Sequence, residues 1–285
     1  MVNSVKSIEA PEGMSRRIAL LEKYGLVTAD FTIKLPSNGW LYPKYEDGTP
    51  ISEVKLRGLT VKEMKWLPTT DVGSASLLNR LLASIIIPPD KGWPAGLTNE
   101  KFVRMLVDGD VPALLLGMRI CTFGLEYRAP VVCWSCAHTY TRDVSLSEEV
   151  DIKHLEVQPR SDGLFEFRDP DIFRNSNVVF RLLTLEDEEA ITSSVEERKK
   201  RGLSAEQDPV IERLLASVVS IGDESDKSDI KFMLNHVPLN MIEKFVENVS
   251  KIDFGPRLDS IETTCPQCNT KDKMTIPLAG LVLSR

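Results

Sequence analysis

The interpretation of this chain rests on two stretches, Cys133-Trp134-Ser135-Cys136 and Cys265-Pro266-Gln267-Cys268. Each CxxC stretch lies between residues that favour strands, with Tyr127–Val132 before the first and Thr139–Leu146 after it. Two thiolates on one tight turn supply half of a tetrahedral metal shell, so two such turns complete a closed four-thiolate site. The sequence therefore predicts a structural zinc ion, and its expected ligands are Cys133, Cys136, Cys265 and Cys268.

The separation of the two motifs leaves other interpretations open. Cys136 and Cys265 lie 129 positions apart, whereas the halves of a simple zinc ribbon are separated by roughly 15–20 residues. One alternative is a redox pair, but this requires a cysteine at a helix N-terminus. Another is a set of unmetallated buried thiols. His138 could replace one thiol as a ligand. A closed four-thiolate shell has no position for substrate, so the metal would hold the fold without catalysing a reaction.

The chain also repeats its parts in the same order. Leu59-Thr60-Val61-Lys62-Glu63 corresponds to Leu183-Thr184-Leu185-Glu186-Asp187, and Arg80–Ser84 is identical in sequence to Arg213–Ser217. One CxxC motif then ends each series. Equivalent turns on two related units can meet across a pseudo-twofold axis, so each unit would donate one cysteine pair. This repeat accounts for the long separation of the motifs.

The fold class expected from these patterns is α+β, with two related units of strands, helices and a CxxC hairpin. Alternation at Phe31–Leu35 and at Phe165–Phe167 predicts strands, and Thr60 and Thr184 are expected helix N-caps. The units form an internal pseudo-repeat joined by a zinc-ribbon-like four-cysteine site. The predicted divisions are an N-terminal extension with a short helix (1–29), a first unit (30–149), a linker (150–162) and a second unit (163–285).

Composition narrows the classes of function. The chain has 285 residues, 42% of them hydrophobic and 27% charged, with a formal net charge of −7. Such an acidic balance argues against nucleic acid and anionic membranes as partners, because both are polyanions. The apolar stretch Leu81–Ile87 is far shorter than the roughly 18 residues of a membrane span. The N-terminus does not resemble a signal peptide, so we expect the protein to be made and used in cytosol, with reduced or metal-bound cysteines.

No catalytic pattern is found in the sequence. Its three histidines form no HExxH motif, and GxSxG, Walker A and GxGxxG motifs are absent. We therefore predict that the protein is not an enzyme and has no small-molecule substrate.

Several further stretches form a recognisable series. In the first half these are Leu35-Pro36-Ser37-Asn38-Gly39, Leu41-Tyr42-Pro43 and Val54–Leu59 followed by Thr60. In the second half, Arg181–Thr184 precedes a helix, and the later CxxC motif leads into Ile276-Pro277-Leu278. These stretches resemble the T-even-phage baseplate hub protein family. The resemblance implies a non-enzymatic structural component of a contractile-tailed phage baseplate. It would be synthesised in the host cytoplasm, located in the virion tail near the central hub, and bound to other baseplate and tail proteins.

Within that implied role, Trp40, Leu41 and Tyr42 are candidate anchors for a partner protein. A rigid aromatic side chain fills a pocket at small entropic cost. The alternative is that Trp40 packs on its own domain.

Three other functions are compatible with parts of the same sequence pattern. The protein could be an assembly factor that leaves before the virion matures. It could be a zinc-ribbon regulator that binds nucleic acid, although acidic and basic residues are mixed around both CxxC motifs. A disulfide oxidoreductase is a further alternative.

Overall fold

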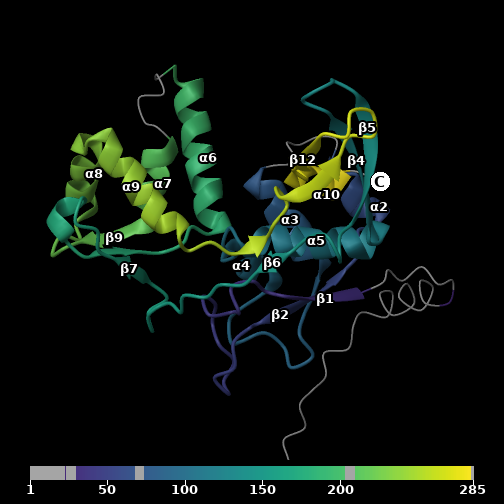
Figure 1. Cartoon of the computed structure of the whole chain (residues 1–285). Helices are drawn as coiled ribbons and strands as arrows, with labels where there is room; N and C mark the ends of the chain where they lie inside the picture. The colour runs from purple at the N-terminus through teal and green to yellow at the C-terminus, as the bar shows by residue number, and fades with distance from the viewer. Residues whose placement is uncertain (1–22, 24–29, 68–73, 203–208, 284–285) are drawn as a thin grey trace, which may run out of the picture.

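The computed structural model describes Lys23 and residues 30–67, 74–202 and 209–283. Figure 1 shows a mixed α+β molecule whose elements gather in two lobes. We call residues 30–153 with 255–283 the first lobe, and residues 154–254 the second lobe. The short helix predicted in the N-terminal extension (1–29) lies outside the described residues apart from Lys23. None of the described helices has both the length and the apolar character needed to cross a membrane.

The first lobe is built on a three-stranded antiparallel sheet in the order β1-β2-β3. Its strands are β1 (Asp30–Lys34), β2 (Glu53–Arg57) and β3 (Ile86–Ile87). The predicted alternation is confirmed, because Ile33 points into the core while its neighbours are more exposed. Its helices are α2 (Val61–Met64), α3 (Ala75–Ile85), α4 (Asn99–Arg104) and α5 (Asp110–Phe123).

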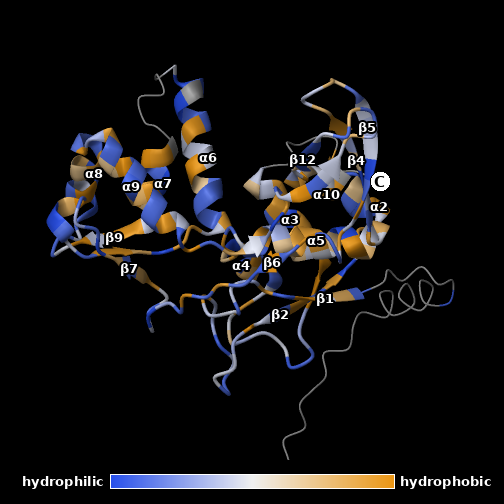
Figure 2. Cartoon of the chain, in the orientation of Figure 1, coloured by the Kyte–Doolittle hydropathy of each residue, from blue (hydrophilic) through white to orange (hydrophobic). Residues whose placement is uncertain are grey.

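Helices α3 and α5 complete the core of this lobe. Figure 2 shows hydrophobic residues along both helices, and the side chains of Leu81, Leu82 and Leu114 are fully buried. Gly58, just after β2, allows the chain to lie directly against the end of α5. A Cβ at this position would lie 2.8 Å from the carbonyl oxygen of Cys121. Helix α5 is the helix that lies against β1 and β2, whereas the buried leucines of α3 lie on a helix that packs against α4, α5 and, in the second lobe, α6 (Leu185–Lys200).

The second lobe has its own three-stranded antiparallel sheet, in the order β7-β8-β9. Its strands are β7 (Phe165–Phe167), β8 (Val178–Phe180) and β9 (Val218–Ile221), with a 3-10 turn, η2 (Phe173–Asn175), between the first two. Its helices are α6 (Leu185–Lys200), α7 (Pro209–Ser217), α8 (Lys227–His236) and α9 (Leu239–Ser250). A separate core here includes Leu214, Ile230 and Phe245.

The chain returns to the first lobe after α9. Strand β6 (Ile152–Lys153), where the chain leaves that lobe, pairs with β10 (Gly255–Pro256), where it returns. The last elements are β11 (Ile261–Thr264), β12 (Lys271–Met274) and α10 (Leu278–Leu283). Ile261, Ile276 and Leu281 belong to the core of the first lobe. The final hairpin therefore packs on the first lobe and not on the β7-β8-β9 sheet, which belongs to the same predicted unit (163–285). The unit boundaries themselves stay a prediction.

Candidate metal centre

Two antiparallel hairpins present the cysteines on turns of the same geometry. The first hairpin consists of β4 (Glu126–Val132) and β5 (Thr139–Ser145), and the second of β11 and β12. The backbone N–H of Cys133 donates to the carbonyl of His138 at 2.9 Å, and that of Cys265 donates to Thr270 at 3.0 Å. The residue that follows each second cysteine, Ala137 or Asn269, has a φ of 56°. These turns therefore orient both thiols of each pair in the same way.

The four sulfur atoms lie at distances that suit a tetrahedral metal. Cys133 Sγ is 3.6 Å from Cys268 Sγ, and Cys136 Sγ is 3.7 Å from Cys265 Sγ. All four sulfurs lie within 4.8 Å of one another. A zinc ion with Zn–S bonds of about 2.3 Å in tetrahedral geometry would place its sulfurs about 3.8 Å apart. A disulfide requires about 2.05 Å, so the observed spacing fits a metal shell and not a cross-link.

The surroundings of the sulfurs shift the pKa values of the two outer thiols in opposite directions. A backbone hydrogen bond lowers the pKa of Cys136, but desolvation and hydrogen bonds with the neighbouring thiols outweigh it and raise that pKa to about 12, whereas the pKa of Cys268 is lowered. Cys133 and Cys265 are buried, whereas Cys136 and Cys268 lie on the outer side of the cluster. A hydrogen bond with the hydroxyl of Thr270, together with the backbone N–H of that residue, lowers the pKa of Cys268 to about 6. Thiolates are the form of cysteine that binds metal. The donor set fits zinc, and it leaves no vacant coordination position for a substrate.

Other side chains near the cluster do not join it. In the described residues, the potential metal-ligand cluster comprises the four cysteines alone. The ring of His138 instead stacks on that of Tyr140, with the planes 10° apart. Cys121 lies at the end of α5, where burial raises the pKa of its thiol to about 11. Because both CxxC turns connect antiparallel strands, they also lack the helix N-terminus that a redox cysteine requires.

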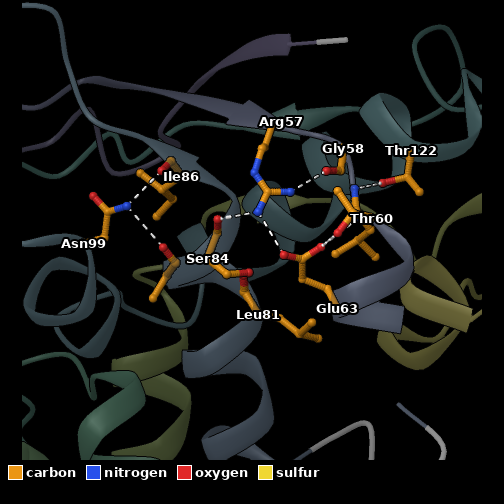
Figure 3. A network of polar contacts seen from close by, with 11 residues as sticks. Arg57, Gly58, Thr60, Glu63, Leu81, Ser84, Ile86, Asn99 and Thr122 are labelled. Carbon is orange, nitrogen blue, oxygen red and sulfur yellow. Dashed lines mark hydrogen bonds and ion pairs between the residues drawn. The ribbon is translucent and has the colours of Figure 1, made fainter. Parts of the chain in front are cut away.

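A polar network near α2 follows directly from the predicted N-cap at Thr60. The backbone N–H of Thr60 donates to Glu63 Oε2 at 2.8 Å, and Arg57 Nη2 donates to Glu63 Oε1 at 2.9 Å. Arg57 also donates to the carbonyl oxygens of Gly58 and Ser84 (Figure 3). Burial opposes the ionisation of Glu63, but the hydrogen bonds from Arg57 and Thr60 outweigh it and lower its pKa to about 2.

The second lobe contains a matching network. The backbone N–H of Thr184 donates to Asp187 at 2.8 Å, and Arg181 forms two hydrogen bonds to the same carboxylate at 2.6 and 2.7 Å. Ser217, the counterpart of Ser84, donates its hydroxyl to the carbonyl of Arg181 at 2.6 Å. Burial of Asp187 is again outweighed by these hydrogen bonds, which lower its pKa to about 2. Both predicted N-caps are confirmed, and the arginines add an ion pair that the N-cap pattern did not predict.

Comparison with known families identifies a match that covers most of the chain. A family model described as T4 bacteriophage base plate protein matches residues 28–281. The chain belongs to the T4 base plate protein family. No curated protein and no solved structure matches the chain. The matched region contains both cysteine pairs and both polar networks of this base plate protein.

The three candidate anchor residues lie at different depths in this base plate protein. Tyr42 is only 4% exposed, and its hydroxyl donates to the carboxylate of Asp110. Little of this side chain is therefore accessible in the isolated chain, and the anchor role of Tyr42 stays a prediction. The loop sequence around Pro43 allows Tyr42 to face either the solvent or the core. In the structure it faces the core, where the buried carboxylate of Asp110 accepts the hydrogen bond from its hydroxyl.

Trp40 and Leu41 are half-buried and connect the lobes. They pack against a small cluster formed by Leu155, Phe165 and Phe180 of the second lobe. Part of each side chain remains accessible to solvent. Their contact with a partner protein stays a prediction. The sequence contained no signal for this packing, because it depends on how the two lobes approach each other.

Proposed function

We propose that this base plate protein is a non-enzymatic structural component of the central hub region of a contractile phage tail. The observation that carries the proposal is the family match over residues 28–281. The cysteine cluster is consistent with such a role, because a saturated thiolate shell stabilises structure and offers no site for a substrate. The partners would be other base plate and tail proteins, and the protein would reside in the virion.

We propose zinc as the metal, held by Cys133, Cys136, Cys265 and Cys268. The sulfur spacing and the tetrahedral donor set support zinc. When bound, the ion would neutralise part of the thiolate charge and tie the two hairpins together. The chain's own contacts already bring them close, since Tyr140 and Thr263 share a hydrogen bond of 2.9 Å between their hydroxyl groups.

We further propose that units 30–149 and 163–285 are copies of one ancestral unit, connected by the linker at 150–162. Three correspondences support this proposal. Both sheets have three antiparallel strands in chain order, both arginine networks cap a helix through a threonine, and both CxxC turns share one hydrogen-bond pattern. The zinc site would then lie on the pseudo-twofold axis between equivalent turns.

An assembly factor absent from the finished virion is the main alternative role in the same family. A nucleic-acid-binding regulator is less well supported, because the hollow beside the hairpins is lined by acidic and basic residues together. These are Arg142, Glu149, Glu262, Lys271, Asp272 and Lys273, with Thr263 and Thr264. Phosphate binding requires an excess of cations, which this surface does not have.

Peptide mass spectrometry on purified virions of the source phage tests the proposed function. A fixed low copy number relative to the tail-tube protein is expected for a structural hub component. Presence in infected cells together with absence from purified particles would contradict the structural role and support an assembly factor. Absence of the protein from tail assemblies at every stage would reject both.

A further inference from the structure

The turn between Cys133 and Cys136 carries an unusually exposed tryptophan. Trp134 is 72% exposed, and Val132 beside it is 64% exposed. The other three tryptophans, Trp40, Trp66 and Trp93, are all half-buried. Exposing a large aromatic side chain to water is unfavourable, and Trp is among the residues that most often dominate binding energy in protein interfaces.

Apart from the cysteine thiols and His138, the two chain segments around Trp134 carry no acidic or basic side chains. Residues 129–141 and residues 263–270 contain no Asp, Glu, Lys or Arg, although 27% of the whole chain is charged. The charged residues begin only at the edges of these segments, at Arg128, Arg142, Glu262 and Lys271. A centre without these four residue types and a rim that contains them match the pattern of a protein–protein interface, whose core is depleted of charged residues. Nucleic acid would require cations at the centre instead.

The turn that presents Trp134 is fixed before any partner arrives. The backbone of Cys133 is bonded to His138, and the N–H of Ala137 donates to the carbonyl of Cys133 at 2.9 Å. The second hairpin supports this turn from the side through the cysteine cluster. A side chain held on such a frame loses little conformational entropy when it binds, so more of its contact energy appears as affinity.

We infer that the tip formed by residues 132–138 and 266–269 docks on another base plate protein by inserting Trp134 into an uncharged, apolar pocket. This inference rests on the proposed function, because it takes the partner from the same tail assembly. The side chains beside Trp134 select the partner's chemistry. With no Asp, Glu, Lys or Arg in residues 129–141 and 263–270, a charged side chain in the pocket around the indole ring would be desolvated without a side chain of opposite charge to pair with.

Complementation of incomplete tails tests this docking. Extract from cells infected with a source phage that carries an early stop codon in this gene is mixed with purified wild-type protein, Trp134→Ala or Phe232→Ala. Phe232 lies on α8 and is 63% exposed, so its variant is a matched control for removing an exposed aromatic side chain. Incorporation of each protein into sedimenting tail particles is measured, together with zinc content and melting temperature.

The expected result is incorporation of wild-type protein and Phe232→Ala, with a loss of about tenfold or more for Trp134→Ala at unchanged melting temperature. Equal incorporation of wild type and Trp134→Ala would overturn the docking inference and leave the proposed function intact. Failure of the wild type to incorporate would overturn both. Equal losses for both variants would show that the tip has no special role.

A photo-crosslinking residue placed at position 134 identifies the occupant. A cross-link to a different tail protein in the complemented particles supports the inference. A cross-link only to a second copy of this chain, or to DNA, would overturn the proposed occupant.

Discussion

Glu63 and Asp187 each lie three residues after a threonine N-cap, and the same kinds of donor hold each of them ionised. Each carboxylate accepts hydrogen bonds from an arginine at the end of a strand and from a threonine N-cap. Glu63 is only 3% exposed, and its arginine partner retains some contact with water. A buried carboxylate in this position needs all of its donors, because an unpaired charge in the interior is strongly destabilising.

Glu63→Gln is expected to lower the free energy of unfolding by about 2 kcal/mol at pH 7, because it leaves Arg57 without its counter-charge. The folded-state pKa of Glu63 is about 2, below its ordinary value of 4.5. The stabilisation from this pair is therefore complete above pH 4.5 and is lost as the pH falls toward 2. Urea unfolding of both proteins across this pH range measures the effect.

The variant should show a weaker loss of stability in acid than the wild type. Glu197→Gln is the control, because Glu197 and Arg201 form an exposed pair and its loss should leave stability unchanged. Identical unfolding of Glu63→Gln and wild type at every pH would show that the network does not stabilise the fold.

The outer cysteine Cys268 allows the metal centre to be tested with little disturbance of the core. Cys268→Ser is expected to reduce bound zinc from one ion per chain to near zero, because a hydroxyl is a poor ligand beside three thiolates. The stabilisation lost would be about 4 kcal/mol where free zinc exceeds the dissociation constant 1,000-fold. Elemental analysis and thermal unfolding measure both quantities.

Cys121→Ser provides the matched control for that measurement. Cys121 is a fifth cysteine outside the cluster, so zinc content should remain at one ion per chain. Unchanged zinc content in Cys268→Ser would contradict a four-thiolate site.

At the scale of elements, close backbone contact between β2 and α5 limits what can replace Gly58. A Cβ there would lie 2.8 Å from the oxygen and 3.2 Å from the carbon of the Cys121 carbonyl group. Backbone atoms at the end of a packed helix cannot move aside as a flexible side chain can. The hydrogen bond from the N–H of Leu59 to Thr122 Oγ1, at 2.9 Å, holds the two elements at this distance.

Gly58→Ala should therefore lower the free energy of unfolding by about 1–3 kcal/mol through overpacking. Chemical denaturation measures the change. Gly48→Ala is a useful comparison, because Gly48 has a φ of 78° and open space around its Cα, so its variant suffers only backbone strain of about 1 kcal/mol. A smaller loss for Gly58→Ala than for Gly48→Ala would contradict the packing argument.

At the scale of the whole molecule, the cysteine cluster joins two segments that flank the entire second lobe. The chain leaves the first lobe at β6, forms the second lobe, and returns at β10 beside β6. The final hairpin then meets the first one within the same chain. A metal in this position would close a chain segment of more than a hundred residues, which reduces the entropy of the unfolded state.

Removal of the metal with a chelator should therefore loosen the two hairpins more than the second lobe. Hydrogen–deuterium exchange is expected to rise in residues 132–140 and 261–274, while α8 and α9 keep their protection because their core is separate. Cys268→Ser should reproduce the pattern without chelator. Equal increases throughout the chain would show that the metal supports global folding instead.

Some of this architecture could be predicted because it depends on neighbours in the sequence. The alternation at Phe31–Leu35 predicted β1, and the Thr60 and Thr184 patterns predicted two helix starts. The paired cysteines predicted the ligands of the candidate metal centre. In each case the pattern lies within a few adjacent residues. The two-residue period of a strand or the geometry of a turn then fixes the directions in which their side chains point.

The sequence by itself thus determined the strands, the caps and the spacing within each cysteine pair, because these are set by local backbone geometry. The tertiary structure decided that the two pairs meet within one chain, that Tyr42 turns inward to Asp110, and that the last hairpin packs on the first lobe. These outcomes depend on which apolar surfaces bury one another over separations of 68 to 135 residues. Such long-range burial is a property of the packed whole, and no local pattern in the sequence specifies it.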